Sequence, residues 1–262
     1  MIIDKTVKKK ILYEHPLNER MRSLLRLEYL LTSIMYHLKG PAEWDSRAVI
    51  EHLIEGLELI TRIDIKALIK DLENHTQTLE RWQRTPEVDT QRLSQLLNQT
   101  RQLLTELENI EEQLNEYITQ HQLFNLVRQR MTIAGGSCRC DLPSYHYWLQ
   151  KSPKQRQSQI NEWLVPLQPL RDAVELDLYL IRNNVSVSQE IASNGFFQSK
   201  LEPNVSYHII QVYMPQEHFC YPEISGGKQR FTIRFFEQPL PQEQPRQIEQ
   251  DVSFELRCCV VA

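Results

Sequence analysis

Three shortages in the sequence limit the kind of protein it can encode. Glycine accounts for only 7 of the 262 residues and cysteine for 5, too few for a collagen-like repeat or a disulfide framework. No stretch approaches the roughly 18 uninterrupted apolar residues of a membrane helix, and the lysine-rich start lacks the apolar run of a signal peptide. Apolar residues make up 41% and charged residues 24% of the chain. We therefore expect a globular, cytoplasmic protein without a membrane segment.

Positive charge is not in excess either. The formal net charge is −4, which argues against a general nucleic-acid-binding protein. The charges are unevenly distributed, however. Residues 43–120 contain 16 acidic and 8 basic side chains, residues 121–160 contain one acidic and six basic ones, and residues 1–39 contain four acidic and eight basic ones. The two basic segments can attract an anionic partner despite the overall sign.

Apolar residues at helical spacing begin at Asn18 and continue to the Gly40-Pro41 pair, which predicts an amphipathic first helix. Ser46 is a candidate cap for a second helix that ends near Ile60. The spacing thus predicts two consecutive helices in the first 60 residues.

A third helix is predicted from an Asp64 cap to about Arg84, and Pro86 should separate it from a fourth. The fourth carries an a/d heptad pattern, which predicts one long helix over 89–130. Its apolar stripe suits either an antiparallel bundle inside the subunit or a dimer seam. The stripe consists of Leu93, Leu96, Thr100, Leu103, Leu107, Ile110, Leu114 and Tyr117.

After the Gly-Gly pair the helical signals resume in shorter pieces. We expect a short helix over 144–150 and a longer one that Ser152 caps. Pro166 and Pro169 should bend or divide the longer helix before it ends near Asn183.

Beyond residue 183 the apolar period changes to two, which is typical of strands with one buried face. Three stretches carry this alternation, and they predict an antiparallel sheet. The residues expected on the apolar sides are Val205, Tyr207 and Ile209; Phe231, Ile233 and Phe235; and Val252, Phe254, Leu256 and Cys258.

These patterns predict an α+β protein, with an N-terminal helical bundle followed by an antiparallel β-sheet. We expect an α-helical domain over 15–183 and a β-strand domain over 184–262. The stretch KKKILYEHPL can form a further strand, so residues 1–14 are expected to join the sheet.

Catalytic chemistry is not visible in the sequence. Acidic pairs are placed on a solvated helix face, without the signs of a buried dyad. Cys138 and Cys140 are separated by one residue, which is short for a zinc-binding pair, so no metal or cofactor is expected. A cytosolic thiol- or metal-dependent regulatory protein that uses these two residues with Cys258 and Cys259 remains an alternative.

Basic residues gather in two motifs and suggest a binding surface. Arg22 and Arg26 share one face of the first helix, Arg128 and Arg130 close the long helical pattern, and His146 lies between two tyrosines. A solvated charged surface is one interpretation. The other is a cradle for an acidic, partly apolar peptide, because arginine pairs with carboxylates and tyrosine supplies contact area at low entropic cost.

Five stretches, in order, resemble the ZapD family of bacterial cell-division factors, which bind the tubulin-like protein FtsZ. They span nearly the whole chain. Two departures from the family pattern are Ala134 in place of proline and Cys140 in place of phenylalanine. The stretches are LYEHPLNERMRSLLRLEYL, LVRQRMTIAGGSCRCDLPSYHYWL, NGFFQ, YPEISGGKQRFTIRFF and FELRCC.

The resemblance implies a homodimer without enzymatic activity that binds the acidic C-terminal peptide of FtsZ. Such a protein would cross-link and bundle FtsZ filaments at midcell, promoting assembly of the division ring (Z-ring) and septation. Arg26 and His146 match the basic motif residues of the family, and Arg22, Arg128 and Arg130 lie in the same two motifs. The net charge and the lack of a long apolar run lead us to expect no nucleic-acid or membrane partner.

Overall fold

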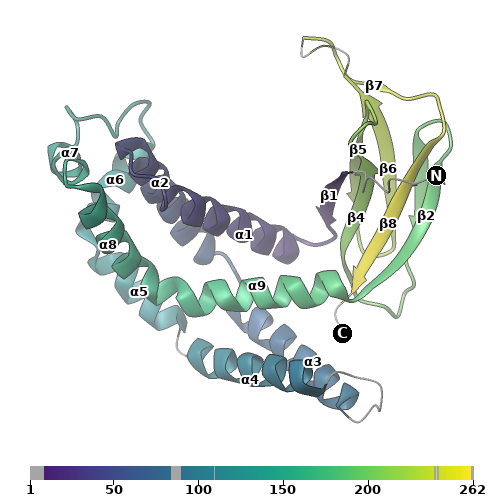
Figure 1. Cartoon of the computed structure of the whole chain (residues 1–262), viewed down its shortest axis with the longest axis horizontal. Coiled ribbons are helices and arrows are strands. Elements are labelled where there is room, and N and C mark those ends of the chain that lie inside the picture. Colours follow the sequence, from purple (N-terminus) through teal and green to yellow (C-terminus); the bar gives the residue numbers. More distant parts are fainter. Residues whose placement is uncertain (1–8, 84–89, 109, 239, 241, 261–262) are drawn as a thin grey trace, which may run out of the picture. The chain divides into compact units, whose positions relative to one another are not determined.

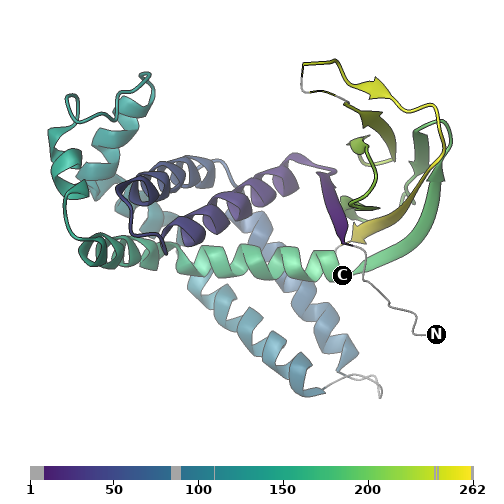
Figure 2. The same ribbon diagram turned by 45° about the horizontal axis from the view of Figure 1, so that its top comes forward.

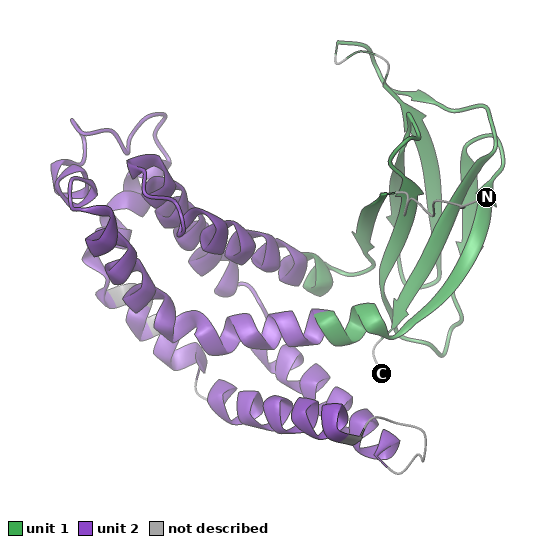
Figure 3. Cartoon of the chain, in the orientation of Figure 1, with its two compact units in different colours: residues 1–22, 179–262 green, residues 23–178 purple. Residues whose placement is uncertain are grey.

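The structure is a computed structural model that describes residues 9–83, 90–108, 110–238, 240 and 242–260 (Figure 1). Helices are followed by antiparallel strands, which confirms the α+β prediction. The chain forms two compact units, one made of residues 1–22 with 179–262 and one of residues 23–178 (Figure 3). Among the described residues, no helix combines the length and apolar character needed to cross a membrane.

The helices have the following bounds. They are α1 (Glu19–His37), α2 (Glu43–Ile60), α3 (Ile65–Trp82), α4 (Thr90–Leu107), α5 (Ile110–Gln120), α6 (Gln122–Met131), α7 (Pro143–Leu149), α8 (Pro153–Leu164) and α9 (Gln168–Asn183), with the short 3₁₀ helix η1 (Val165–Leu167) between the last two. The 3₁₀ turn confirms the predicted division at Pro166, because proline removes a helical hydrogen bond there.

Two predicted helix caps are confirmed and one is wrong. Asp64 accepts a hydrogen bond from the Ala67 amide at 3.0 Å, and Ser152 caps α8. The α2 helix, in contrast, begins three residues before Ser46. Asp45 Oδ2 accepts a hydrogen bond from the Ala42 amide, at the N-terminal end of α2, at 3.0 Å. Ser46 therefore lies inside the helix, where it is buried.

The long helix predicted over 89–130 is not continuous. It is divided into α4, α5 and α6, and His121 lies between the last two with φ −86° and ψ 87°. The His121 ring stacks on Phe124 with 3.7 Å between centroids and meets the Trp163 ring edge-on at 5.0 Å. This aromatic packing overrides the heptad pattern. Pro86 and the predicted start at 89 lie outside the described residues.

The apolar stripe is buried within the chain, which supports the intramolecular bundle over the dimer seam. Figure 2 shows α3 and α4 side by side as a hairpin, and Leu79 of α3 packs against Leu93 and Leu97 of α4. Further along the stripe, Leu103 and Leu107 are also buried. Apolar side chains thereby hold the hairpin together.

The strands form two antiparallel sheets. Sheet A has the order β1-β4-β8-β2, and sheet B has the order β3-β6-β5, with β7 paired to β6. The first strand joins sheet A, as predicted. The bounds are β1 (Lys10–Pro16), β2 (Val185–Ala192), β3 (Phe196–Lys200), β4 (Tyr207–Pro215), β5 (Tyr221–Gly226), β6 (Arg230–Glu237), β7 (Arg246–Gln247) and β8 (Val252–Val260).

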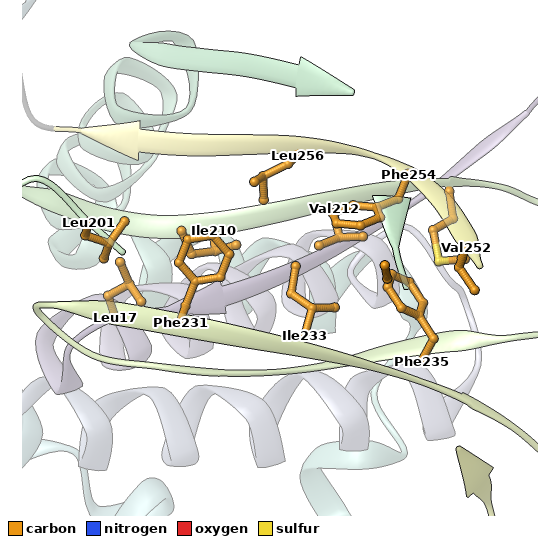
Figure 4. Close-up of a cluster of buried hydrophobic side chains, with 12 residues drawn as sticks. Leu17, Leu201, Ile210, Val212, Phe231, Ile233, Phe235, Val252, Phe254 and Leu256 are labelled. Atoms are coloured by element: carbon orange, nitrogen blue, oxygen red, sulfur yellow. The ribbon is translucent and has the colours of Figure 1, made fainter. Parts of the chain in front are cut away.

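The core of this unit lies between the sheets (Figure 4). The predicted alternation is confirmed for β6. On β8 the predicted apolar residues face the core, but Cys259 of the opposite face is buried too. On β4 the prediction fails, because the register shifts between Tyr207 and Ile209. The side chains of Ile210 and Val212 consequently point into the core, and Ile209 lies on the opposite face.

Candidate partner-binding surface

A groove of about 390 Å³ lies beside Arg26, between α1 and α2. Arg26 of α1 and Arg62, just after α2, are both exposed. Leucines from both helices supply its apolar part. The residues that line the groove are Arg26, Tyr29, Leu30, Glu55, Glu58, Leu59 and Arg62.

The charges around the groove are mixed. The guanidinium groups of Arg26 and Arg62 attract an anionic ligand, and the carboxylates of Glu55 and Glu58 repel it. Tyr29 is 68% exposed and offers a ring with few rotatable bonds. The arrangement suits a ligand that presents carboxylates to Arg26 and Arg62 and an apolar group to the leucines. It is a poor fit for a uniformly anionic polymer.

The α7 helix carries His146 on its less buried side. Tyr145 and Trp148 face inward, and burial raises the pKa of the Tyr145 hydroxyl well above its usual value. Tyr147 is 74% exposed. His146 is half-buried; its Nδ1 atom is itself buried and has no hydrogen-bond partner among the described residues.

Arg47 of α2 contacts both α7 and the loop that precedes it. Its Nη2 atom pairs with Glu43 Oε1 at 2.9 Å, and Nη1 donates to the Ser137 carbonyl oxygen at 3.0 Å. The guanidinium also lies over the Trp44 and Tyr145 rings, 5.3 and 5.2 Å from their centroids. Cation–π contacts and the charged hydrogen bonds together fix the helix against α2.

Arg156 of α8 forms hydrogen bonds at the C-terminal end of α7. The buried guanidinium donates to Ser46 Oγ at 2.9 Å and to the Pro41 carbonyl at 2.8 Å. It also donates to the carbonyl oxygens of Leu149, at 2.9 Å, and of Lys151. One side chain thus ties the C-terminal end of α7 to the start of α2.

Arg128 and Arg130 are exposed in the last turn of α6. The chain then turns through Gly135, which has a φ of 72°. Gly136 packs so closely against the Arg130 carbonyl that a Cβ atom would clash there. The loop over 132–142 therefore folds back on the end of α6 before it reaches α7.

Arg22 belongs to the unit that contains the sheets. Its Nε atom pairs with Glu19 Oε1 at 3.2 Å, one turn earlier in α1. The pKa of His15, on β1, is lowered by burial and by the positive charge of Arg22.

Of the predicted residues, only Arg26 lines the groove. Arg128 and Arg130 lie in the last turn of α6, and His146 lies on α7. Sequence reasoning missed Arg62, Tyr29, Arg47 and Arg156. The spacing of four between Glu43 and Arg47 is a signal for a helical ion pair. The position of Arg156 on the apolar side of α8, four residues before Ile160, is a second signal.

The geometry of the last strand argues against the four-cysteine alternative. Cys258 and Cys259 are adjacent on β8, so their side chains lie on opposite faces of the sheet. Burial raises their pKa values to about 11 and about 12, and both thiols are therefore protonated at neutral pH. Adjacent strand residues cannot bind one ion together. Cys138 and Cys140 lie in the other unit.

Comparisons with known proteins agree with one another. The ZapD family model, described as a cell division protein, matches residues 25–234. "Cell division protein ZapD" of Methylococcus capsulatus (strain Bath) is 36% identical over 256 residues, covering 97% of this chain and all of that protein. The protein of the same name from Enterobacter sp. (strain 638) is 34% identical over 95% of this chain and 98% of that protein. The chain belongs to the ZapD family of cell division proteins.

Proposed function

We propose that the chain is a non-enzymatic cross-linker of FtsZ filaments that binds the acidic C-terminal peptide of FtsZ. Membership of the ZapD family supports a role in cell division. The structural observation that carries the proposal is the groove in which Arg26 and Arg62 flank leucine side chains. The protein would act at midcell, where bundled filaments strengthen the division ring and promote septation.

A peptide with acidic and apolar side chains matches this groove. Each arginine can bind a carboxylate through two parallel hydrogen bonds, while the leucines and Tyr29 cover the apolar part of the peptide. Glu55 and Glu58 would disfavour a peptide in the wrong register, because like charges repel across the groove. The half-buried His146 and the exposed Arg128 and Arg130 would extend the contact.

Cross-linking follows if the protein is a homodimer with one peptide site per subunit. A filament displays many copies of the peptide, so the second contact is effectively intramolecular, and avidity can rise by roughly 10²- to 10⁴-fold. Two sites on one dimer can also bind neighbouring filaments. A weak peptide affinity is then sufficient to bundle filaments.

The double variant Arg26→Glu with His146→Glu tests the proposal in a co-sedimentation assay with FtsZ filaments. We expect loss of binding and bundling, with the oligomeric state unchanged by gel filtration. Lys66→Glu with Lys70→Glu is the control, because both lysines are exposed on α3, outside the groove and both basic motifs. Equal sedimentation of the two double variants would refute the assignment of the site.

Ionic strength provides a second test of the same mechanism. Exposed charge pairs are screened over about 8 Å at 0.15 M salt. Binding should therefore weaken steadily as salt is added. Binding that does not change between low and high salt would exclude an ionic contact as its main source.

A further inference from the structure

The loop between α6 and α7 contains a pair of thiols in direct contact. Cys138 Sγ lies 2.7 Å from Cys140 Sγ and donates to Asp141 Oδ2 at 3.3 Å. Cys140 is exposed and Cys138 is half-buried. These two residues are separated by the exposed Arg139, at a point where the chain makes consecutive turns.

The surrounding loop keeps the two sulfur atoms together. The Cys138 carbonyl accepts hydrogen bonds from the amides of Asp141, at 3.3 Å, and Leu142, at 3.1 Å. The residue before the pair, Ser137, is held through its carbonyl by buried Arg47. The turn is thus anchored on both sides of Cys138. Little further movement of the side chains is needed to join the sulfurs.

The sulfur separation distinguishes between two uses of this cluster. The ligand atoms of the two thiols and the Asp141 carboxylate lie within 4.8 Å of one another, close enough to bind one metal ion. Two thiolates on a tetrahedral zinc ion, each at about 2.3 Å, would be roughly 3.8 Å apart. The observed 2.7 Å is closer to the separation in a disulfide, about 2.05 Å, than to that value. The geometry favours bond formation between the sulfurs.

We propose that Cys138 and Cys140 form a reversible dithiol–disulfide pair that exchanges with small-molecule disulfides such as glutathione disulfide. The exposed Cys140 thiolate attacks one sulfur of the small disulfide, forms a mixed disulfide and releases the first thiolate. The Cys138 thiolate then attacks Cys140 Sγ, closes the Cys138–Cys140 bond and releases the second. The cysteines lose two electrons, which reduce the small disulfide, and their two protons pass to the released thiolates.

The position of Arg139 between the cysteines permits a direct assay. The full-length protein is equilibrated in buffers of varying ratio of glutathione to glutathione disulfide, alkylated and digested with trypsin. In the oxidised protein, cleavage after Arg139 leaves the fragments 131–139 and 140–151 joined through the disulfide. Reductant should separate them. A gel without reductant must show monomeric chains, which excludes a bond between two molecules.

Substitutions distinguish this pair from the other thiols. Cys138→Ser and Cys140→Ser should each abolish the linked fragments, whereas Cys258→Ser, which removes a half-buried thiol of the sheet unit, should leave them unchanged. The proposal is overturned if the wild-type chain gives only glutathione adducts or no disulfide. Stoichiometric zinc binding that blocks oxidation would also overturn it. None of these outcomes depends on FtsZ binding, so the proposal is independent of the proposed function.

Discussion

Substituting Arg156 by methionine should destabilise the helical unit strongly, because its guanidinium connects four acceptors. They are the Ser46 hydroxyl and the carbonyl oxygens of Pro41, Leu149 and Lys151. Hydrogen bonds from a charged donor contribute about 1.5–3 kcal/mol each, or roughly 6–12 kcal/mol in total. Burial of the guanidinium offsets several kcal/mol of this gain. We expect Arg156→Met to lower the free energy of unfolding by about 3–4 kcal/mol.

Tryptophan fluorescence measures this loss selectively during unfolding in urea. All four tryptophans, Trp44, Trp82, Trp148 and Trp163, lie within residues 23–178. The fluorescence signal therefore reports on the helical unit alone. A loss of this size would remove a large part of the roughly 5–15 kcal/mol that stabilises a typical domain.

Lys154→Met is the matched control, since Lys154 is exposed on the same helix. It should change the free energy of unfolding by less than about 0.5 kcal/mol. Arg156→Lys should lie between the two variants, because lysine keeps the charge but loses the planar array of donors. If Arg156→Met and Lys154→Met unfold at the same urea concentration, the hydrogen bonds of Arg156 do not stabilise the helical unit.

Three further predictions concern single interactions. Asp64→Ala should destabilise α3 by about 1 kcal/mol in the same fluorescence assay, and Asp64→Asn, which can still cap, should not. Ile233→Ala should cost about 2–5 kcal/mol and accelerate hydrogen exchange of the sheets, whereas Thr232→Ala on the other face of β6 should leave it nearly unchanged. The hydrogen bond from Lys10 lowers the pKa of Glu255, so its stabilising effect is present above the usual carboxyl pKa and is lost as the pH falls. Hydrogen exchange measured at several pH values should show that Glu255→Gln reduces the loss of stability at acid pH. An unchanged loss would show that the Glu255 carboxylate is not its source.

The sequence predicted elements well where local chemistry determines them. The Asp64 and Ser152 caps and the alternation around Ile233 depend on neighbouring residues, and all three are confirmed. Prediction failed where distant residues decide the outcome. The helix break at His121 follows from a contact with Trp163, which is 42 positions later in the chain. The register shift on β4 likewise depends on its pairing with β8.

The candidate site was only partly visible in the sequence for the same reason. Periodicity placed Arg26 on the first helix, but no local pattern links it to Arg62, which lies beyond the next helix. Arg47 and Arg156 stand among charged residues that normally mark a solvated surface, yet both are buried. Their hydrogen bonds to backbone carbonyls explain how the charges are accommodated.

The proposed binding to the C-terminal peptide of FtsZ is tested by removing that peptide from FtsZ. Co-sedimentation should compare filaments of intact FtsZ with filaments that lack the peptide, at equal polymer mass. We expect the protein to pellet with the intact filaments only, and free peptide to displace it. Equal pelleting with both kinds of filament would show that the C-terminal peptide is not the binding site.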